Sequence, residues 1–222
     1  MKRLVIAIDG PSGAGKGTVA RAVAASLGYR HIDSGAMYRA VAWKARRDDI
    51  ALDDEAAIAR EAGTSRIEIA DDRVAIDEVT VTREIRTPEI DRAAAAVARL
   101  PEVRKILVAR QRALGLDGGI VMEGRDIGTV VFPDADVKIY MDASAEERAR
   151  RRAHDPAHSG GPTAVAEVAS LLTERDRSDQ TRAVSPLYAA EDAVVIDTTG
   201  KGIPEVVKEV LRVVSTKFTN SN

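Results

Sequence analysis

Residues 10–18 read Gly10-Pro11-Ser12-Gly13-Ala14-Gly15-Lys16-Gly17-Thr18, and they follow the apolar run Leu4-Val5-Ile6-Ala7-Ile8 after a single aspartate. Glycines in such a turn adopt backbone angles that a Cβ forbids, so successive N–H groups can face one bound anion. Lys16 adds a positive charge, and the helix expected from this residue on adds the unpaired N–H groups of its first turn. The stretch predicts a strand, a loop and a helix that together bind a nucleoside triphosphate.

The loop departs from the commonest phosphate-binding form at one position. That form has Ser or Thr directly after the lysine, where the hydroxyl binds Mg²⁺, whereas here Gly17 intervenes before Thr18. We therefore expect a metal held mainly by water and nucleotide, and the sequence assigns no direct metal ligand. The ending Gly15-Lys16-Gly17-Thr18 is similar to that of nucleoside monophosphate kinases.

Length and composition restrict the class of protein. A chain of 222 residues is long enough for one α/β domain with insertions. The net charge of −2 gives no overall field for nucleic acid or an anionic membrane, and the absence of cysteine excludes disulfides and cysteine-based zinc sites. There is no signal-peptide pattern and no apolar run near the roughly 18 residues that span a bilayer. We expect a cytoplasmic protein with no nucleic-acid, membrane or obligate protein partner.

Short apolar runs alternate with longer helical segments, a pattern that predicts a parallel sheet covered by helices. The strands are expected at residues 4–8, 29–32, 119–122, 137–141 and 193–196. The helices are expected at residues 16–27, 36–47, 53–62, 101–114, 145–154, 163–179 and 204–214. The predicted fold is an α/β three-layer sandwich with a five-stranded parallel sheet.

Two segments interrupt this alternation. Between Thr64 and Glu89, apolar and polar residues alternate with period two on both sides of a polar turn, which predicts a small antiparallel insertion. His154–Pro162 contains two prolines and a Gly-Gly pair, the composition of a mobile lid. We expect a single domain with a core at residues 1–62 and 98–222, an insertion at about 63–97, and a lid at about 148–165.

Motifs along nearly the whole chain resemble those of the bacterial cytidylate kinases, which belong to the P-loop nucleoside monophosphate kinases. In order, the motifs are Ile8 to Thr18, Asp33-Ser34-Gly35-Ala36-Met37-Tyr38-Arg39, Glu84-Ile85-Arg86-Thr87-Pro88, Gly124 to Ala135, and Glu174 to Pro186. The resemblance implies a P-loop NTPase fold and transfer of the γ-phosphoryl group of ATP to CMP, and also to dCMP, with Mg²⁺. A UMP/CMP or other nucleotide kinase, a silent nucleotide-binding regulator and a nucleic-acid-binding P-loop protein stay open as alternatives.

The second predicted strand ends at residues that the resemblance assigns to the acceptor. The carboxyl ends of parallel strands are where open α/β sheets bind ligands. The resemblance implies that Ser34 and Arg39 hold the CMP phosphate, and the alternative is a helix cap followed by a surface arginine. Asp33 either orients magnesium-bound water or supports the loop.

The third parallel strand ends at Arg125 and Asp126. The resemblance implies that Arg125 binds phosphate, that Asp126 accepts a hydrogen bond from the cytosine amino group, and that Arg104 donates to the base. Cytosine has a donor where uracil has an acceptor, so a carboxylate suits it, although a structural Arg–Asp ion pair is the alternative. Many family members have a base-contacting serine where this chain has Ala95, a loss of about 0.5–1.5 kcal/mol that leaves use of UMP open.

The remaining candidates are charged residues at helical spacing. Arg175, Asp179 and Arg182 are spaced by four and three residues, so they share one helix face if the helix extends as far as Arg182. The resemblance implies that the first two meet the ribose and the third meets phosphate. Arg148 and Arg152 are four residues apart and are candidate transition-state clamps, unless the cluster around Arg151 only pairs with the glutamates before it. The expected catalytic residues are thus Lys16, Arg125, Arg148, Arg152 and Arg182. A phosphate acceptor has a second pKa of about 6, so we expect no general base.

Overall fold

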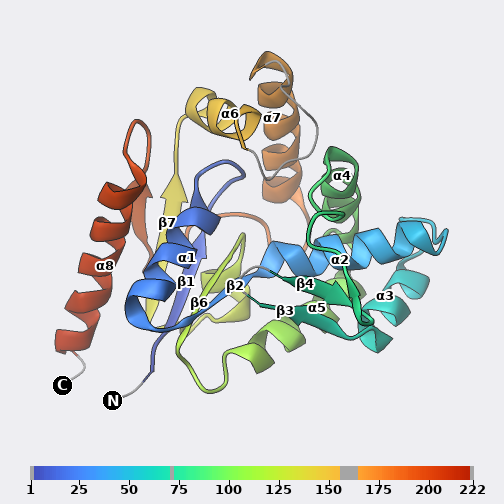
Figure 1. Ribbon diagram of the computed structural model, residues 1–222, viewed down its shortest axis with the longest axis horizontal. Helices are drawn as coiled ribbons and strands as arrows, with labels where there is room; N and C mark the ends of the chain where they lie inside the picture. The colour runs from blue at the N-terminus through green and yellow to red at the C-terminus, as the bar shows by residue number, and fades with distance from the viewer. Residues whose placement is uncertain (1–2, 71–72, 156–164, 221–222) are drawn as a thin grey trace.

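The computed structural model describes residues 3–70, 73–155 and 165–220. Residues 156–164, the middle of the predicted lid, lie outside these ranges. Five parallel strands form one sheet in the order β2-β6-β1-β7-β8 (Figure 1). This confirms the predicted five-stranded parallel sheet, and each strand lies within two residues of its expected bounds: β1 (Val5–Asp9), β2 (Arg30–Asp33), β6 (Ile120–Gly124), β7 (Val137–Asp142) and β8 (Val194–Asp197).

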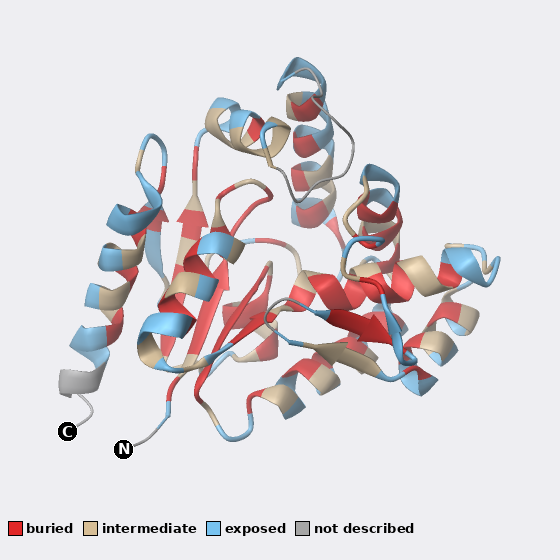
Figure 2. Cartoon of the chain, in the orientation of Figure 1, coloured by how far each residue is buried: buried red, intermediate tan, exposed pale blue. Residues whose placement is uncertain are grey.

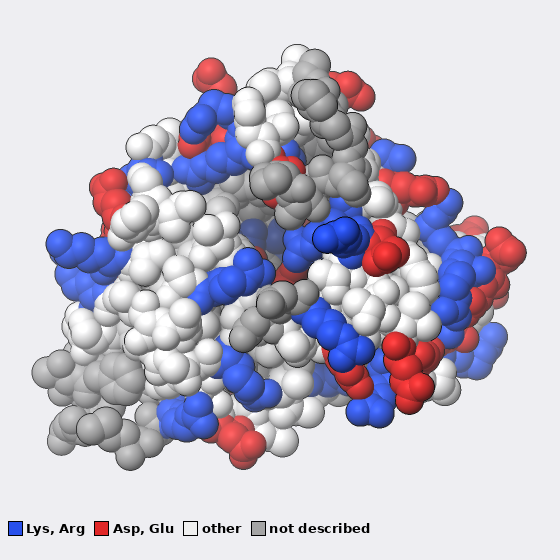
Figure 3. All heavy atoms as spheres, in the orientation of Figure 1, with Lys and Arg blue, Asp and Glu red and all other residues white. Residues whose placement is uncertain are grey.

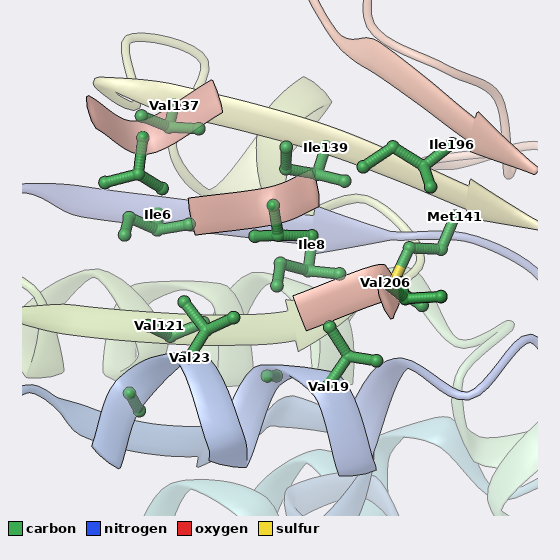
Figure 4. Packing of buried hydrophobic residues seen from close by; sticks show 14 of the residues in the cluster. Ile6, Ile8, Val19, Val23, Val121, Val137, Ile139, Met141, Ile196 and Val206 are labelled. Carbon is green, nitrogen blue, oxygen red and sulfur yellow. The ribbon is translucent and has the colours of Figure 1, made fainter. Parts of the chain in front are cut away.

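The central strands β1 and β6 are buried on both faces because consecutive residues in them are apolar, so each side of the strand carries apolar side chains. On β1, Ile6 and Ile8 are fully buried against the layer made by α1 (Lys16–Leu27) and α8 (Ile203–Asn220), as Figure 4 shows. Ala7 faces the opposite layer, where α5 (Pro101–Leu114) packs. Figure 2 shows the central strands β1 and β6 buried and the outer helix faces exposed. Full burial of each isoleucine contributes about 1.5–3 kcal/mol, so these two layers hold the central strand in place.

The predicted helices are present, and three of them begin after a capping side chain, which is Asp33, Asp54 or Ser144. Both α1 and α5 have the expected bounds, whereas α2 begins earlier than expected because the Asp33 carboxylate accepts a hydrogen bond from the N–H of Ala36. The α8 helix reaches Asn220, beyond the expected end at residue 214. The other predicted helices are α2 (Ser34–Arg47), α3 (Glu55–Thr64), α6 (Ala145–Ala153) and α7 (Val165–Thr181).

The insertion between β2 and β6 contains one strand and one helix more than the sequence predicts. Its antiparallel sheet consists of β3 (Ile67–Ile69), β4 (Val74–Ile76) and the short β5 (Val79–Thr80). The unpredicted helix α4 (Pro88–Val97) packs against α2. Thr87 caps this helix by accepting from the N–H of Ile90 at 3.2 Å, and proline occupies the first helical position.

After β6 the chain forms a short π-helix, η1 (Ile127–Val131), which the sequence did not predict. The chain ends of the described structure lie near each other, at the side of the sheet away from the carboxyl ends of the strands (Figure 1). Among the described residues, none of the helices has the length and apolar character needed to cross a membrane.

Candidate active site

A cavity of about 1020 Å³ lies at the carboxyl ends of the strands, and Lys and Arg side chains surround the hollow in Figure 3. Most of the predicted site residues line it, although they come from distant parts of the chain. They are residues 12–18, Ser34, Arg39, Arg104, Arg125, Asp126, Arg152, Arg175, Asp179 and Arg182. Gly10, Pro11 and Arg148 are predicted site residues that are not part of the lining.

The glycines of the P-loop serve two different purposes. Gly10, Gly13 and Gly15 have positive φ angles of 147°, 81° and 87°, as the sequence predicts. Gly17 lies instead in the first turn of α1 and has no positive φ, so its expected unusual angle is wrong. A Cβ on Gly17 would lie only 2.8 Å from Oε1 of Glu123. Position 17 therefore requires glycine because the Glu123 carboxylate occupies the space that a Cβ would take, and not because of an unusual backbone angle.

Lys16 lies inside the loop as a buried cation. Its side chain points back along the P-loop, and Nζ donates a hydrogen bond to the carbonyl oxygen of Pro11 at 2.7 Å. Burial, followed by the neighbouring positive charge of Arg125, lowers the pKa of Lys16 from 10.5 to about 7. Within the described residues, the ammonium group forms no ion pair with a carboxylate. A polyanion entering the loop would supply the missing negative charge.

Residues at the end of β2 form a tight local group. The Asp33 carboxylate caps α2 and also accepts from Arg39 at 2.6 Å, while Ser34 donates to the carbonyl oxygen of Glu123 at 2.6 Å. Burial opposes ionisation of Asp33, but Arg39 and other positive neighbours outweigh it and lower the pKa of this carboxyl. The structure thus contains the helix cap foreseen as an alternative, with Arg39 in the cavity lining rather than on the open surface.

Arg104 and Asp126 form a buried ion pair in the cavity lining. Arg104 donates to Oδ2 of Asp126 and, at 3.2 Å, to the carbonyl oxygen of Ala98. Its guanidinium carbon lies 5.5 Å from the ring centre of Tyr38, whose own pKa is raised to about 12 by burial. The structure thus contains the Arg–Asp ion pair that was the structural alternative, formed by Arg104 and Asp126.

Arg125 instead pairs with Asp179 of α7. Its Nε donates to Oδ2 of Asp179 at 2.9 Å, and Arg182, just beyond the end of the helix, lies 3.8 Å from the other carboxylate oxygen. Burial disfavours the charged form of Asp179, but Arg125, Arg175 and Arg182 together lower its pKa. Asp179 therefore contacts the segment that follows β6, and because α7 ends at Thr181 the predicted shared helix face includes Arg175 and Asp179 but not Arg182.

The arginines of α6 separate into different roles. Arg151 pairs with Glu147 at 2.8 Å, as the alternative reading foresaw, and its NH1 donates to the hydroxyl oxygen of Thr198 at 2.9 Å. Arg148 donates to the carbonyl oxygen of Ser12 at 3.1 Å and to Asp176, so it contacts the P-loop backbone from outside the cavity lining. Arg152 lines the cavity and pairs with Asp91 of α4.

Sequence reasoning missed three carboxylates next to the cavity. Asp9 ends β1 and accepts from the N–H groups of Ile127 and Gly128 at 2.8 and 2.7 Å, and burial raises its pKa to about 6. Glu123 is the penultimate residue of β6, and its carboxylate lies 3.3 Å from the His31 ring. Asp9 lies within the motif Ile8 to Thr18, and Glu123 directly precedes the motif that begins at Gly124. An acidic residue at the end of an apolar strand next to a motif could therefore have identified both. Asp91 lies in the first turn of α4, and the start of this helix at Thr87 and Pro88 was also visible in the sequence.

The described residues contain no cluster of three His, Asp or Glu side chains that could hold a metal ion alone. Asp33 and Glu123 are acidic residues of the cavity lining. Their carboxylates suit a Mg²⁺ ion that is bound mainly by phosphate oxygens and water, as the glycine at position 17 suggests.

A P-loop on a five-stranded parallel sheet, together with a cavity lined by arginines, defines a P-loop kinase. A gluconokinase structure from Sinorhizobium meliloti shares the fold, with a TM-score of 0.53 at 16% identity over 100% of this chain and 99% of that one. The chain belongs to the cytidylate kinase family, whose sequence model matches residues 6–216.

Two curated relatives illustrate the family match. A cytidylate kinase from Desulfitobacterium hafniense is 50% identical, covering 97% of this chain and 94% of its own length. A bifunctional pantoate ligase/cytidylate kinase from Trichormus variabilis is 47% identical over 93% of this chain but only 40% of its own length. The family and the class of transferase predicted from the sequence are confirmed.

Proposed function

We propose that this protein transfers the γ-phosphoryl group of ATP to the phosphate of CMP, and also of dCMP, to give ADP with CDP or dCDP. The main support is one cavity that is lined both by the P-loop and by the arginine–aspartate pairs of α5, β6 and α7. A phosphate donor and a nucleotide acceptor can therefore lie in the same enclosed space. The proposal includes a cytoplasmic location, because nucleoside triphosphates are made and used inside cells.

The P-loop, residues 10–18, is assigned to ATP. Backbone N–H groups from this loop and the first turn of α1 surround the β- and γ-phosphates, and Lys16 supplies a charge that moves with the transferred group. The lowered pKa of Lys16 in the free protein supports this role, since the phosphates would restore the full charge of the ammonium group. Mg²⁺, held by ATP and by water that Asp33 and Glu123 orient, would neutralise charge on the phosphates.

The acceptor side is assigned to CMP. Ser34, Arg39 and Arg125 bind its phosphate, while Asp126 and Arg104 pair with the cytosine ring. Arg175 and Asp179 meet the sugar, and Arg182 meets the phosphate. Asp126 contacts two arginines, since Arg104 donates to one of its carboxylate oxygens and Arg182 lies 3.8 Å from the other. These contacts fix the direction in which its oxygens can accept a hydrogen bond from the base.

Transfer then needs positioning and charge rather than a general base. An oxygen of the CMP phosphate, already deprotonated at neutral pH, forms a bond to the γ-phosphorus. The bond from that phosphorus to the bridging β-oxygen breaks, and its electron pair stays on ADP. Lys16, Arg125, Arg152 and Arg182 stabilise the negative charge spread over the transferred group. Arg148 contributes by holding the P-loop backbone through its bond to Ser12.

The test is ADP release from Mg²⁺-ATP with CMP, dCMP, UMP, AMP, GMP, dTMP and shikimate supplied one at a time. We expect strong stimulation by CMP and dCMP. Comparable turnover of UMP would contradict the base assignment and point to Ala95, which leaves only a methyl group on the acceptor side of α4. Silence with every acceptor would overturn the proposal and favour a nucleotide-binding regulator.

A further inference from the structure

The buried carboxylate of Asp91 lies next to the cavity and has no role in the proposed transfer mechanism. Asp91, on α4, is 9% exposed, and it contacts arginines from two other helices. Its Oδ2 accepts a hydrogen bond from Arg152 of α6, and its Oδ1 lies 3.5 Å from NH1 of Arg175 on α7. Both arginines belong to the cavity lining, whereas Asp91 does not. It therefore contacts two lining residues from outside the nucleotide space.

The charges explain why a carboxylate is needed there. Burial, together with the positive charges of Arg175 and Arg39, lowers the pKa of Arg152, and Asp91 is the foremost group that opposes this shift. Two partly buried guanidinium groups side by side repel each other, and each loses hydration. A shared carboxylate offsets both effects and fixes the direction in which each guanidinium points.

Asp91 also joins two parts of the molecule. It lies on the insertion helix α4, and its partners lie on α6 and α7, which pack against each other. A second contact at the same junction runs from NH1 of Arg99 to the hydroxyl oxygen of Ser178 at 3.0 Å. One turn along the same face of α4, Ala94 and Ala95 line the acceptor side of the cavity. The helix that borders the acceptor thus also holds the arginines opposite it.

We propose that Asp91 is a positioning residue for phosphoryl transfer, which holds Arg152 and Arg175 at the cavity and fixes the α6–α7 pair to α4. This rests on the proposed function, in which Arg152 meets the transferred phosphoryl group and Arg175 the acceptor sugar. The acceptor-binding helix and the charge that stabilises transfer are then assembled as one unit.

The kinetic test uses Asp91→Asn, with Glu89→Gln as a matched control on the exposed side of the same helix, where Glu89 pairs with Arg46. Asp91→Asn should lower kcat for CMP on the order of 10- to 100-fold, with KM for ATP changed less than about twofold because the P-loop is untouched. Asp91→Glu should restore part of the loss. In an Arg152→Ala, Arg175→Ala background, Asp91→Asn should have almost no further effect. An unchanged kcat, or an equal loss in both backgrounds, overturns the proposal.

A second measurement does not depend on activity. The chain has no cysteine, so spin labels on Arg92→Cys of α4 and Gln180→Cys of α7, both at exposed positions, report one distance. Without nucleotide we expect a single narrow distance distribution for the parent and for Glu89→Gln, and a broad one for Asp91→Asn. An unchanged distribution in Asp91→Asn overturns the proposal even if the protein melts at a lower temperature. If the parent protein failed to phosphorylate CMP and Asp91→Asn still broadened the distribution, the proposed function would be rejected while the Asp91 contact would be supported.

Discussion

The two sides of the cavity are built in different ways. The donor side is one continuous stretch, residues 10–18, between a strand and a helix that follow each other in the chain. The acceptor side joins Arg104 to Asp126 and Arg125 to Asp179, which are 22 and 54 residues apart. A site made of backbone N–H groups is specified by local sequence, whereas a site made of paired side chains depends on how distant segments pack.

The two sides also differ in whether their positively charged side chains already have carboxylate partners. On the donor side Lys16 is buried without an ion pair among the described residues, so a bound phosphate supplies a missing counter-charge. On the acceptor side Arg104, Arg125 and Arg39 already have carboxylate partners. An acceptor phosphate must therefore exchange one negative partner for another. We expect the donor side to tolerate substitution least and the acceptor side to be adjustable.

The largest effect should follow from Lys16→Ala on the donor side. Removing the charge that accompanies the transferred group should lower kcat on the order of 10³-fold, because the rest of the site cannot replace it. The fold should survive, since the substitution leaves no carboxylate without its partner. ADP formation with CMP and a thermal melt measure both points. Lys105→Ala, at an exposed lysine of α5, is the control, and unchanged turnover in Lys16→Ala would contradict the assignment.

On the acceptor side, Asp126→Asn should reduce the preference for CMP over UMP. One carboxylate oxygen becomes an NH₂ group that opposes the cytosine amino group, a change of about 1–3 kcal/mol or 5- to 150-fold. The ratio of kcat/KM values for the two acceptors measures it. Asp134→Asn, at an exposed position in the same motif, should leave the ratio as it is. If Asp126→Asn kept its preference for CMP, Asp126 would be only the partner of Arg104.

A pH series separates the two sides without mutation. Above pH 7 the free protein carries an increasingly neutral Lys16 that must take up a proton to pair with phosphate. The affinity for ATP should then fall by at most about tenfold per pH unit between pH 7.5 and 9. The same shift makes the free protein more stable as pH rises from 7 toward 10.5, because the unfolded chain binds more protons there. Titration of ATP binding measures the slope.

Lys16→Arg keeps its charge throughout this range, so its affinity for ATP should vary much less with pH. The affinity for CMP should also change little, since Lys16 is not among the residues proposed to bind CMP. A flat pH profile for ATP in the unmodified protein would show that Lys16 is fully charged before the nucleotide arrives.

The smallest effect is expected for Ala95→Ser on the acceptor side. A hydroxyl added to the cavity face of α4 can form one hydrogen bond with the base, worth about 0.5–1.5 kcal/mol, so the preference for CMP should rise by up to about tenfold. Competition between CMP and UMP measures the change. Ala96→Ser, at the neighbouring position outside the cavity lining, is the control. A drop in CMP turnover would show that the space near Ala95 is already filled by the acceptor.

The difference between the two sides also explains what could be predicted from the sequence. The apolar run, the P-loop and α1 were predicted closely because each depends on neighbouring residues. The spacing of Arg175 and Asp179 similarly placed both residues on one helix face, whereas Arg182 lies just beyond the end of α7. The partners of these side chains could not be predicted in this way, and the pairing of Arg125 with Asp179 was not predicted.

The π-helix η1 is a further example of tertiary control. Its first two residues, Ile127 and Gly128, donate their N–H groups to the carboxylate of Asp9. Asp9 lies at the end of the neighbouring strand β1, 118 and 119 residues earlier in the chain. No local propensity encodes such a turn. The α4 helix is a different case, because Thr87 and Pro88 are an ordinary start signal that the sequence analysis did not use.

The neighbouring chain ends bear on how this fold combines with others. Both lie at the side of the sheet opposite the cavity, as Figure 1 shows. A second domain fused there would leave the nucleotide entrance open and would not need to cross the sheet. The Trichormus variabilis relative, in which the matched part is 40% of a bifunctional protein, is an arrangement of the kind that this geometry permits. The same ends are therefore suitable places for tags, surface immobilisation or a fused partner enzyme.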